Sequence, residues 1–268
     1  MFYNAVNGLI KIDDTDMDYI CFGNGDKNLV MIPGLGDGLI TVKGTAIPFA
    51  FMYKEFAKDY RIYVFSRKNK IEEGYSTKDM AIDLAEAMKK IGINKSSIIG
   101  VSQGGMIAQH LAINYPNLVD KLVLVVTVAK SNETLNEVVG NWIDMARCGN
   151  YKGIMIDTAE KSYTEKAIKK YRLLYPIITR VGKTKDFDRF IIQAKSCINH
   201  NSYDELYKIN SKTLVIGGDS DKVVGINTSE QIAHIIPNSK LVILKGLGHM
   251  AYEEAKDFNT IVLNFLNA

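Results

Sequence analysis

The sequence predicts an α/β fold: a mostly parallel, doubly wound sheet with an N-terminal antiparallel hairpin and a helical cap insertion. Short apolar runs alternate with helical patterns through most of the chain, a turn-rich spacer separates the first two runs, and one long helical segment interrupts the alternation. Runs that are apolar throughout are typical of strands covered on both faces. We therefore expect helices on both faces of an open sheet.

The first two runs predict the hairpin, and six later runs predict the other strands. The segments "GLIKI" and "MDYICFG" flank the spacer "DDTD", as the two arms of a hairpin would. Each later run is short and ends at a glycine or a polar residue. These runs are "NLVMIPG", "RIYVF", "SSIIGV", "KLVLVVTVA", "KTLVIGG" and "KLVILKG".

Helical patterns fill the intervals between the predicted strands. In "STKDMAIDLAEAMKKIG" four apolar residues recur at helical spacing: Met80, Leu84, Met88 and Ile91. Ser76 or Thr77 can cap the start of this helix, and Gly92 can close its end. Residues 131–210 are helix-like throughout and contain no convincing strand. The sequence therefore predicts a core formed by residues 1–130 and 211–268, with residues 131–210 inserted as a helical cap.

Composition and charge favour a small, mostly apolar partner. The 268 residues are 47% hydrophobic, and 33 basic and 30 acidic side chains leave a formal charge of +3 without charged blocks. This pattern favours neither nucleic acid nor an anionic membrane as a partner. No apolar run is long enough to span a bilayer, and the N-terminus does not resemble a signal peptide. We expect a cytoplasmic protein; the sequence leaves the oligomeric state open and is compatible with a homodimer.

Cys21, Cys148 and Cys197 are odd in number and far apart in the sequence. This spacing favours reduced thiols over a disulfide framework or a zinc site. We expect all three to be small core residues.

The segment "GVSQGG" predicts a nucleophile at Ser102. A buried strand, "SSIIGV", comes directly before it, and the helical pattern "MIAQHLAINYP" follows. Such an abrupt turn strains the residue at its apex, and side chains two positions away on either side would collide with neighbouring elements. Gly100 and Gly104 avoid that collision. The turn therefore projects the Ser102 hydroxyl above the edge of the sheet.

A serine nucleophile needs a base and an acid that orients the base. His249 follows the last predicted strand in a glycine-bracketed loop and is the predicted base. The other three histidines are interpreted as helix-face or surface residues: His110, His200 and His234. The acid follows "TLVIGG", where Asp219 and Asp221 are both available, and one of the two is expected only to shape the turn.

These motifs resemble the α/β-hydrolase superfamily, in particular its capped serine hydrolases and carboxylesterases. The resemblance covers nearly the whole chain outside residues 131–210 and rests on "GVSQGG", "LVIGGDSDKVV" and "GLGHMAYEEAKDFNTIVLNFL". The order nucleophile, acid, histidine is that of the family. Counting from Gly218 in the family's G-x-x-D-x-x-V segment makes Asp221 the acid and Asp219 the turn residue.

The resemblance also implies an oxyanion hole. By resemblance, the backbone amides of Leu35 and Gln103 would stabilise the oxyanion. The family's first oxyanion loop normally contains a histidine where this sequence has Pro33, in "IPGLGDG". Asp37 is a candidate to replace the hydrogen bonds that usually fix this loop.

The implied reaction is two-step acyl transfer on a small carboxylic ester, or a related lactone or thioester. Ser102 would attack the carbonyl, and His249 would take its proton while Asp221 holds the imidazole. No cofactor and no metal are expected, because the histidines show no ligand spacing. Carbon–carbon bond hydrolysis, cofactor-free perhydrolase chemistry and a ligand-binding sensor on the same fold stay as alternatives. The cap is rich in aromatic and methionine side chains, and each is interpreted as a core residue.

Overall fold

A single sheet organises the computed structural model, which describes residues 3–180, 184 and 186–268. The strands are β1 (Val6–Ile12), β2 (Thr15–Phe22), β3 (Lys27–Ile32), β4 (Tyr60–Lys68), β5 (Ser96–Val101), β6 (Val119–Val125), β7 (Lys212–Gly218) and β8 (Ser239–Leu244). Their order across the sheet is β1-β2-β4-β3-β5-β6-β7-β8. β1 and β2 pair antiparallel, β2 pairs antiparallel with β4, and the remaining pairs are parallel. The predicted hairpin and the six predicted later strands are confirmed.

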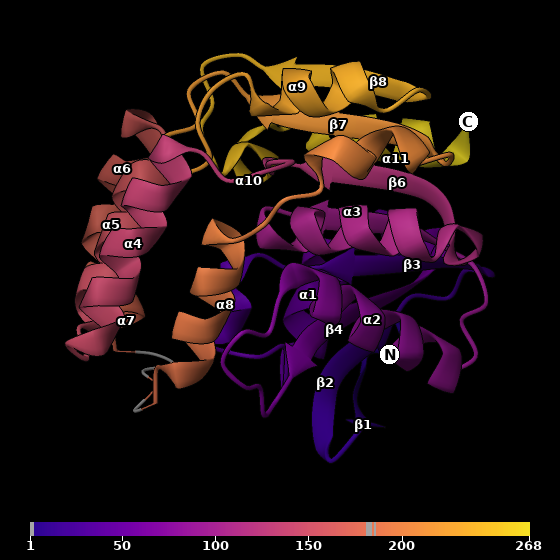
Figure 1. Cartoon of the computed structure of the whole chain (residues 1–268), viewed down its shortest axis with the longest axis horizontal. Coiled ribbons are helices and arrows are strands. Elements are labelled where there is room, and N and C mark those ends of the chain that lie inside the picture. The colour runs from indigo at the N-terminus through magenta and orange to yellow at the C-terminus, as the bar shows by residue number, and fades with distance from the viewer. Residues whose placement is uncertain (1–2, 181–183, 185) are drawn as a thin grey trace.

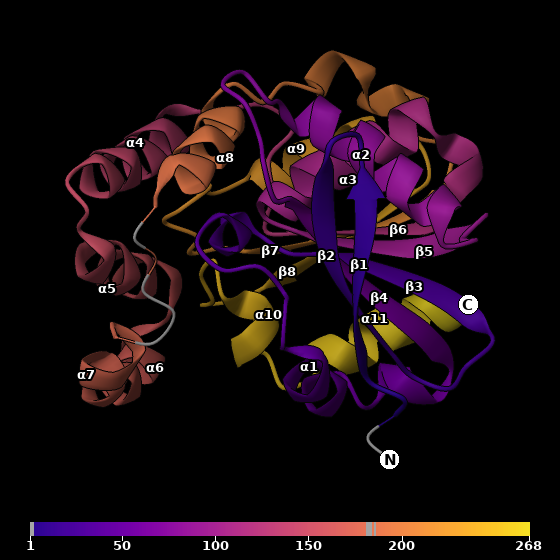
Figure 2. The same cartoon turned by 90° about the horizontal axis from the view of Figure 1, so that it is seen from below.

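Helices cover both faces of this sheet (Figures 1 and 2). The α-helices are α1 (Ala46–Met52), α2 (Thr77–Lys90), α3 (Gln103–Asn114), α4 (Glu133–Arg147), α5 (Tyr151–Ser162), α6 (Glu165–Tyr171), α7 (Tyr175–Ile178), α8 (Asp188–Ile198), α9 (Thr228–Ile235), α10 (Ala251–Glu254) and α11 (Phe258–Asn267). Short 3-10 helices are η1 (Leu35–Gly38), η2 (Phe56–Lys58), η3 (Pro116–Leu118), η4 (Arg172–Leu174) and η5 (Tyr203–Lys208).

Two apolar clusters fix the helices to the sheet. One cluster packs α2, α3 and α9 on one face, and the other packs α1, α10 and α11 on the opposite face. The predicted helix over residues 76–92 forms as α2, where Ser76 provides a capping box with Asp79 and Gly92 follows the last turn with φ of +80°. The predicted doubly wound fold is therefore confirmed.

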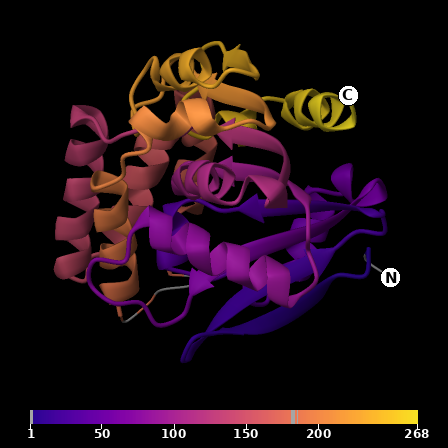
Figure 3. The same ribbon diagram turned by 45° about the vertical axis from the view of Figure 1, so that its right-hand side comes forward.

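Helices α4 to α8 come between β6 and β7 and lie at the end of the molecule opposite the two chain termini (Figures 1 and 3). The two ends of this segment lie side by side, because Ser202 N donates to Ala129 O at 2.7 Å and Lys130 forms a bridge with Asn201. A third apolar cluster, which includes Leu35, Trp142 and Phe190, packs the segment against the core. We therefore propose residues 131–210 as a cap, with 1–130 and 211–268 as the core; positions 181–183 and 185 of this cap lie outside the described residues.

The cysteine prediction holds only in part. All three cysteines are free, and Cys21 and Cys197 are buried, but Cys148 is exposed. The prediction of a core position was wrong for Cys148 because this residue ends α4 and precedes a turn at Gly149, where the chain turns toward solvent. Within the described ranges, no helix is long and apolar enough to cross a membrane.

Candidate active site

Ser102 lies in the turn between β5 and α3, in a strained conformation. Its φ is +54°, a value that non-glycine residues rarely adopt. A Cβ on Gly100 would lie 2.4 Å from Gly104 O, and one on Gly104 would lie 2.0 Å from Ile32 O. Both glycines are therefore required, as the sequence predicts. Ser102 N donates to Val125 O at 2.9 Å, which holds the turn against β6.

Two loops at the same edge of the sheet bring His249 and Asp221 to Ser102. His249 follows β8, and Asp221 follows β7. His249 Nε2 lies 3.0 Å from Ser102 Oγ, and His249 Nδ1 lies 2.8 Å from Asp221 Oδ2. A proton on Nδ1 is then donated to the carboxylate, which leaves Nε2 to accept from the hydroxyl. The three residues form one continuous hydrogen-bonded chain.

The two candidate acids have different surroundings. Asp221 is buried, and its Oδ1 accepts from the amides of Val223 and Val224 at 2.8 and 3.0 Å. These bonds leave Oδ2 directed at His249. Asp219 instead accepts from the amide of Gly246 at 2.6 Å and joins the two loops outside the hydrogen-bonded chain. This geometry separates an orienting carboxylate from a turn carboxylate.

The loop that carries Leu35 lies directly beside Ser102. A Cβ on Gly34 would lie 3.4 Å from Ser102 Cβ and 3.9 Å from its Oγ. Leu35 is the first residue of η1 and Gln103 the first of α3, so neither amide has a partner inside its own helix. Both belong to helix starts that adjoin Ser102, which suits them to an oxyanion. The Gln103 side chain is fully buried and turned away, with its Oε1 accepting from Arg67 Nη2 at 2.8 Å.

Ser102 and His249 line a cavity of about 400 Å³ between the core and the cap. Its walls are mainly apolar, and the core contributes Leu35, Leu39, Ile40, Val42, Phe49, Val101 and Tyr252. The cap contributes Trp142, Ile154, Met155, Thr158 and Phe190. Trp142 and Phe190 are buried in the third apolar cluster, as predicted for core residues, and they also line the cavity; Met155 lines the cavity without belonging to that cluster. Helical spacing marks an apolar face but does not tell whether a cavity or a packed core lies against it.

The remaining histidines lie away from Ser102, as expected, but two of them are not surface residues. His110 and His200 are both buried, and their rings meet edge to face with centroids 5.2 Å apart. The interpretation of His200 as a surface residue was wrong because its segment packs against α2 and α3, with Nδ1 2.9 Å from Thr77 Oγ1. His234 is on α9 and exposed.

No group of three or more His, Cys, Asp or Glu side chains among the residues with described positions could hold a metal ion. A second cavity, of about 760 Å³, lies within the cap between α5 and α7 and is lined by Tyr151, Arg172 and Tyr175. Neither Ser102 nor His249 lines it. The chemistry of the site thus belongs to the smaller cavity.

The model of the alpha/beta hydrolase fold family matches residues 27–148 and 167–256. The chain belongs to the alpha/beta hydrolase family. This chain is similar to a 2-hydroxy-6-oxononadienedioate/2-hydroxy-6-oxononatrienedioate hydrolase of Pseudomonas sp, with 24% identity over 97% of this chain and 93% of the relative. The family and such relatives support a hydrolase.

Two solved structures share the fold over nearly their whole length. One is MGS-M2, an alpha/beta hydrolase enzyme from a Medee basin deep-sea metagenome library, with a TM-score of 0.85, 23% identity and coverage of 97% of this chain and 98% of that one. The other is the enol-lactonase from Burkholderia xenovorans LB400, with a TM-score of 0.82, 17% identity and coverage of 97% and 100%. The predicted superfamily and fold are confirmed.

Proposed function

We propose that this hydrolase cleaves a small carboxylic ester, or a related lactone or thioester, with Ser102 as nucleophile, His249 as general base and Asp221 as the orienting acid. The observation that carries the proposal is the hydrogen-bonded chain of these three side chains at the floor of an apolar cavity. A serine becomes a useful nucleophile only beside such a base.

The reaction proceeds in two steps. Ser102 Oγ attacks the carbonyl carbon while His249 Nε2 takes the hydroxyl proton, and the amides of Leu35 and Gln103 donate to the oxyanion. His249 then gives that proton to the leaving alkoxide, which leaves an acyl group on Ser102. Water, activated by His249, attacks this acyl-enzyme and releases the acid. Asp221 stabilises the imidazolium that forms in both steps.

The cavity walls support a compact, mostly apolar acyl group as substrate. Among the described residues that line the cavity, none is a lysine or an arginine, and the charged residue among them is Asp37. An anionic substrate would find no cationic side chain to pair with on these walls. A cytoplasmic location and a homodimer stay predictions.

Turnover on a panel of small esters tests the proposal, with wild type and Ser102→Ala measured together. We expect turnover by wild type and a loss of at least about 10³-fold in Ser102→Ala, because the hydrogen-bonded chain loses its nucleophile. A fluorophosphonate probe should label wild type at Ser102 and leave the folded variant unlabelled. Labelling at another serine would overturn the assignment of the nucleophile.

A second candidate is hydrolysis of a carbon–carbon bond, which the relative named as a dienedioate hydrolase favours. The same three side chains could serve it, but a dienedioate carries two carboxylates, and the apolar walls do not suit them. The panel therefore includes a 2-hydroxy-6-oxo-dienoate beside the esters. A higher kcat/KM on that compound would replace the ester proposal, and an absence of turnover on every compound would favour a ligand-binding sensor.

A further inference from the structure

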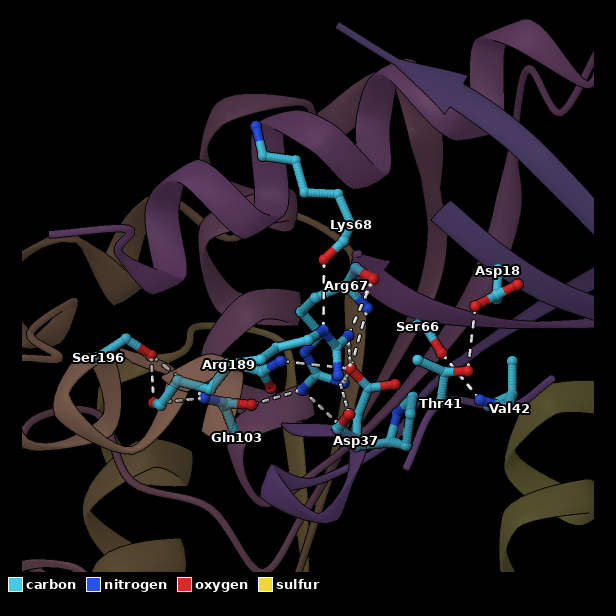
Figure 4. Close-up of polar contacts among 12 residues, drawn as sticks. Asp18, Asp37, Thr41, Val42, Ser66, Arg67, Lys68, Gln103, Arg189 and Ser196 are labelled. Carbon is cyan, nitrogen blue, oxygen red and sulfur yellow. Dashed lines mark hydrogen bonds and ion pairs between the residues drawn. The ribbon is translucent and has the colours of Figure 1, made fainter. Parts of the chain in front are cut away.

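Three charged side chains, one of them from the short helix that begins at Leu35, meet in a buried cluster (Figure 4). Asp37 belongs to η1, Arg67 to the end of β4, and Arg189 to cap helix α8. The side chains of Asp37 and Arg67 are 1% and 2% exposed, and that of Arg189 is 15% exposed. A carboxylate this deeply buried requires partners that balance its charge.

Arg67 provides the core half of this cluster. Its Nη2 donates to Pro33 O at 2.6 Å and to Gln103 Oε1 at 2.8 Å, and its backbone N donates to Asp37 Oδ2 at 3.1 Å. One guanidinium thus joins the loop before Leu35 to the residue that follows Ser102. The two helix starts proposed to bind the oxyanion are held by the same side chain.

Helix α8 of the cap provides the other half. Arg189 Nη2 donates to Asp37 Oδ2 at 2.6 Å and to Arg67 O at 3.0 Å, and Arg189 Nη1 donates to the backbone carbonyl of Asp37. The Gln103 side chain donates through Nε2 to Gln193 O at 2.8 Å, also on α8. A cap helix therefore contacts both sides of the proposed oxyanion hole.

The packing around these contacts leaves the loop little freedom. A Cβ on Gly38, the last residue of η1, would lie 2.9 Å from Phe190 Cα, so backbone of the loop and backbone of α8 are in close contact. Burial raises the pKa of Asp37, but the guanidiniums of Arg189 and Arg67 outweigh this effect and hold the pKa below its usual value. Asp37 is therefore ionised near neutral pH and keeps both arginines bound.

We propose that Arg189 is a positioning residue, through which the docked cap holds the oxyanion loop in the geometry that catalysis needs. The proposal rests on the proposed function. It assigns Arg189 no contact with substrate, since its guanidinium is used by Asp37 and by the carbonyl of Arg67. The cap and the oxyanion hole then form one unit, and displacement of α8 from the core displaces the loop.

Substitution of Arg189 tests this coupling without leaving an isolated buried charge, because Asp37 stays paired with Arg67. We compare wild type, Arg189→Gln, Arg189→Lys and the control Arg172→Gln. Arg172 is another cap arginine that pairs with a carboxylate, Glu160, but it does not line the cavity that contains Ser102. Tm, kcat and KM on the best ester, and the rate constant for labelling of Ser102 by a fluorophosphonate are measured for each.

In Arg189→Gln we expect kcat and the labelling rate constant to fall together by about tenfold or more, since an oxyanion donor displaced by a fraction of an ångström loses much of its effect. KM should change by less than about twofold, because every side chain that lines the cavity is retained and the oxyanion donors act mainly in the transition state. Arg189→Lys should recover part of the loss, because an ammonium reaches Asp37 but lacks the fork that also reaches the backbone carbonyls of Asp37, Arg67 and Lys68. Arg172→Gln should match wild type in every rate.

A lower Tm for Arg189→Gln with kcat and labelling rate unchanged would overturn the proposal and leave a purely structural role. A rise in KM with kcat unchanged would also overturn it, because Arg189 would then contact substrate. Should Arg189→Gln fail to fold, Arg189→Lys with a wild-type Tm decides by the same two rates. Failure of the proposed function would be distinguished by the labelling experiment, because the fluorophosphonate would then not label Ser102 in the wild-type protein.

Discussion

Ser102 is held in a conformation that costs on the order of 1–3 kcal/mol relative to an ordinary backbone. Three contacts offset this strain: Ser102 N donates to Val125 O, and Ser102 O accepts from Thr127 Oγ1 at 2.7 Å and from Gly105 N at 2.8 Å. These contacts come from β6, from the segment that follows it and from α3, so packed neighbouring elements hold the strained residue in place. The hydroxyl thus keeps one position relative to His249.

The two aspartates after β7 provide a test at single-residue resolution. Asp221→Asn should lower kcat by about 10³-fold or more, because His249 loses the anion that fixes its tautomer and stabilises the imidazolium. Asp219→Asn should lower the free energy of unfolding by about 1 kcal/mol, through its bond to the Gly246 amide, and leave kcat within severalfold of wild type. Steady-state kinetics and urea unfolding of the two variants check this; equal losses of kcat would contradict the assignment of Asp221.

The sequence predicts the site best at positions where local backbone geometry allows few residue types. A glycine on each side of Ser102 and the loop position of His249 reflect local constraints, and the structure brings Ser102, Asp221 and His249 together. The charged cluster has no such local sign. Arg67 and Arg189 are 122 positions apart in sequence. Nothing in the residues around either one distinguishes it from a surface arginine, and only the fold brings the two together.

Among the elements, strands were easier to predict than the role of the cap. Strands buried on both faces leave continuous apolar runs, and each of these runs forms a strand. The cap helices show apolar faces, and residues on these faces such as Phe190 and Trp142 both pack in the third apolar cluster and line the cavity. Whether an apolar residue also meets a cavity depends on where the neighbouring elements lie, and periodicity does not record that.

Polar contacts around His200 attach the end of the cap, here called the base of the cap, to the core. Its Nδ1 lies 2.9 Å from Thr77 Oγ1 on α2, and its ring packs against His110 on α3. Ser202, two residues on, donates to Gln109 Oε1 at 2.5 Å. The base of the cap is thus attached to the core through neutral groups.

The buried His200 at the base of the cap should make the free energy of unfolding depend on pH. Burial, together with a smaller effect of the nearby His110, lowers the pKa of His200 to about 3. An unfolded histidine has a pKa of about 6.5, so below that pH the unfolded chain binds a proton that the folded chain does not. The contribution of His200 is therefore complete above pH ~6.5 and is lost as the pH falls toward 3, by up to about 1.4 kcal/mol per pH unit.

Urea unfolding at several pH values between 7 and 4 measures this dependence. His200→Asn should lower the free energy of unfolding at pH 7 and flatten its decline on the acid side. The exposed His234 provides the control variant His234→Asn, which removes a histidine without touching the base of the cap. A wild-type free energy of unfolding that is constant between pH 6.5 and 4 would contradict the prediction.

At the scale of the whole molecule, the edge of the sheet and the cap together determine which substrates fit the proposed site. The loops after β5, β7 and β8 deliver the three polar side chains to this edge, where ligands bind in open α/β sheets. The cap closes the space above them, so the cavity has a limited volume of about 400 Å³. Volume and apolar walls together predict how activity varies with acyl length.

We expect kcat/KM on nitrophenyl esters, from acetate to palmitate, to rise with acyl length and then fall sharply. Each methylene buried against the apolar walls contributes about 0.8 kcal/mol, or roughly fourfold in kcat/KM, until the cavity is full. A longer acyl chain must then displace the cap. Because the proposed role of Arg189 couples the cap to the oxyanion loop, this displacement would also misplace the Leu35 amide and lower kcat. The optimum should therefore lie at short to medium chains.

Substitution of two half-buried methionines of the cap tests whether the cavity volume sets the optimal acyl length. Met155 lines the cavity and Met145 does not, although both belong to cap helices. Met155→Phe should shift the optimum to shorter acyl groups because it fills part of the cavity, whereas Met145→Phe should leave the optimum unchanged. Hydrolysis that is fastest with palmitate, or strongly activated by lipid interfaces, would mean that the cap opens like a lipase lid. The cavity volume would then not limit the substrate.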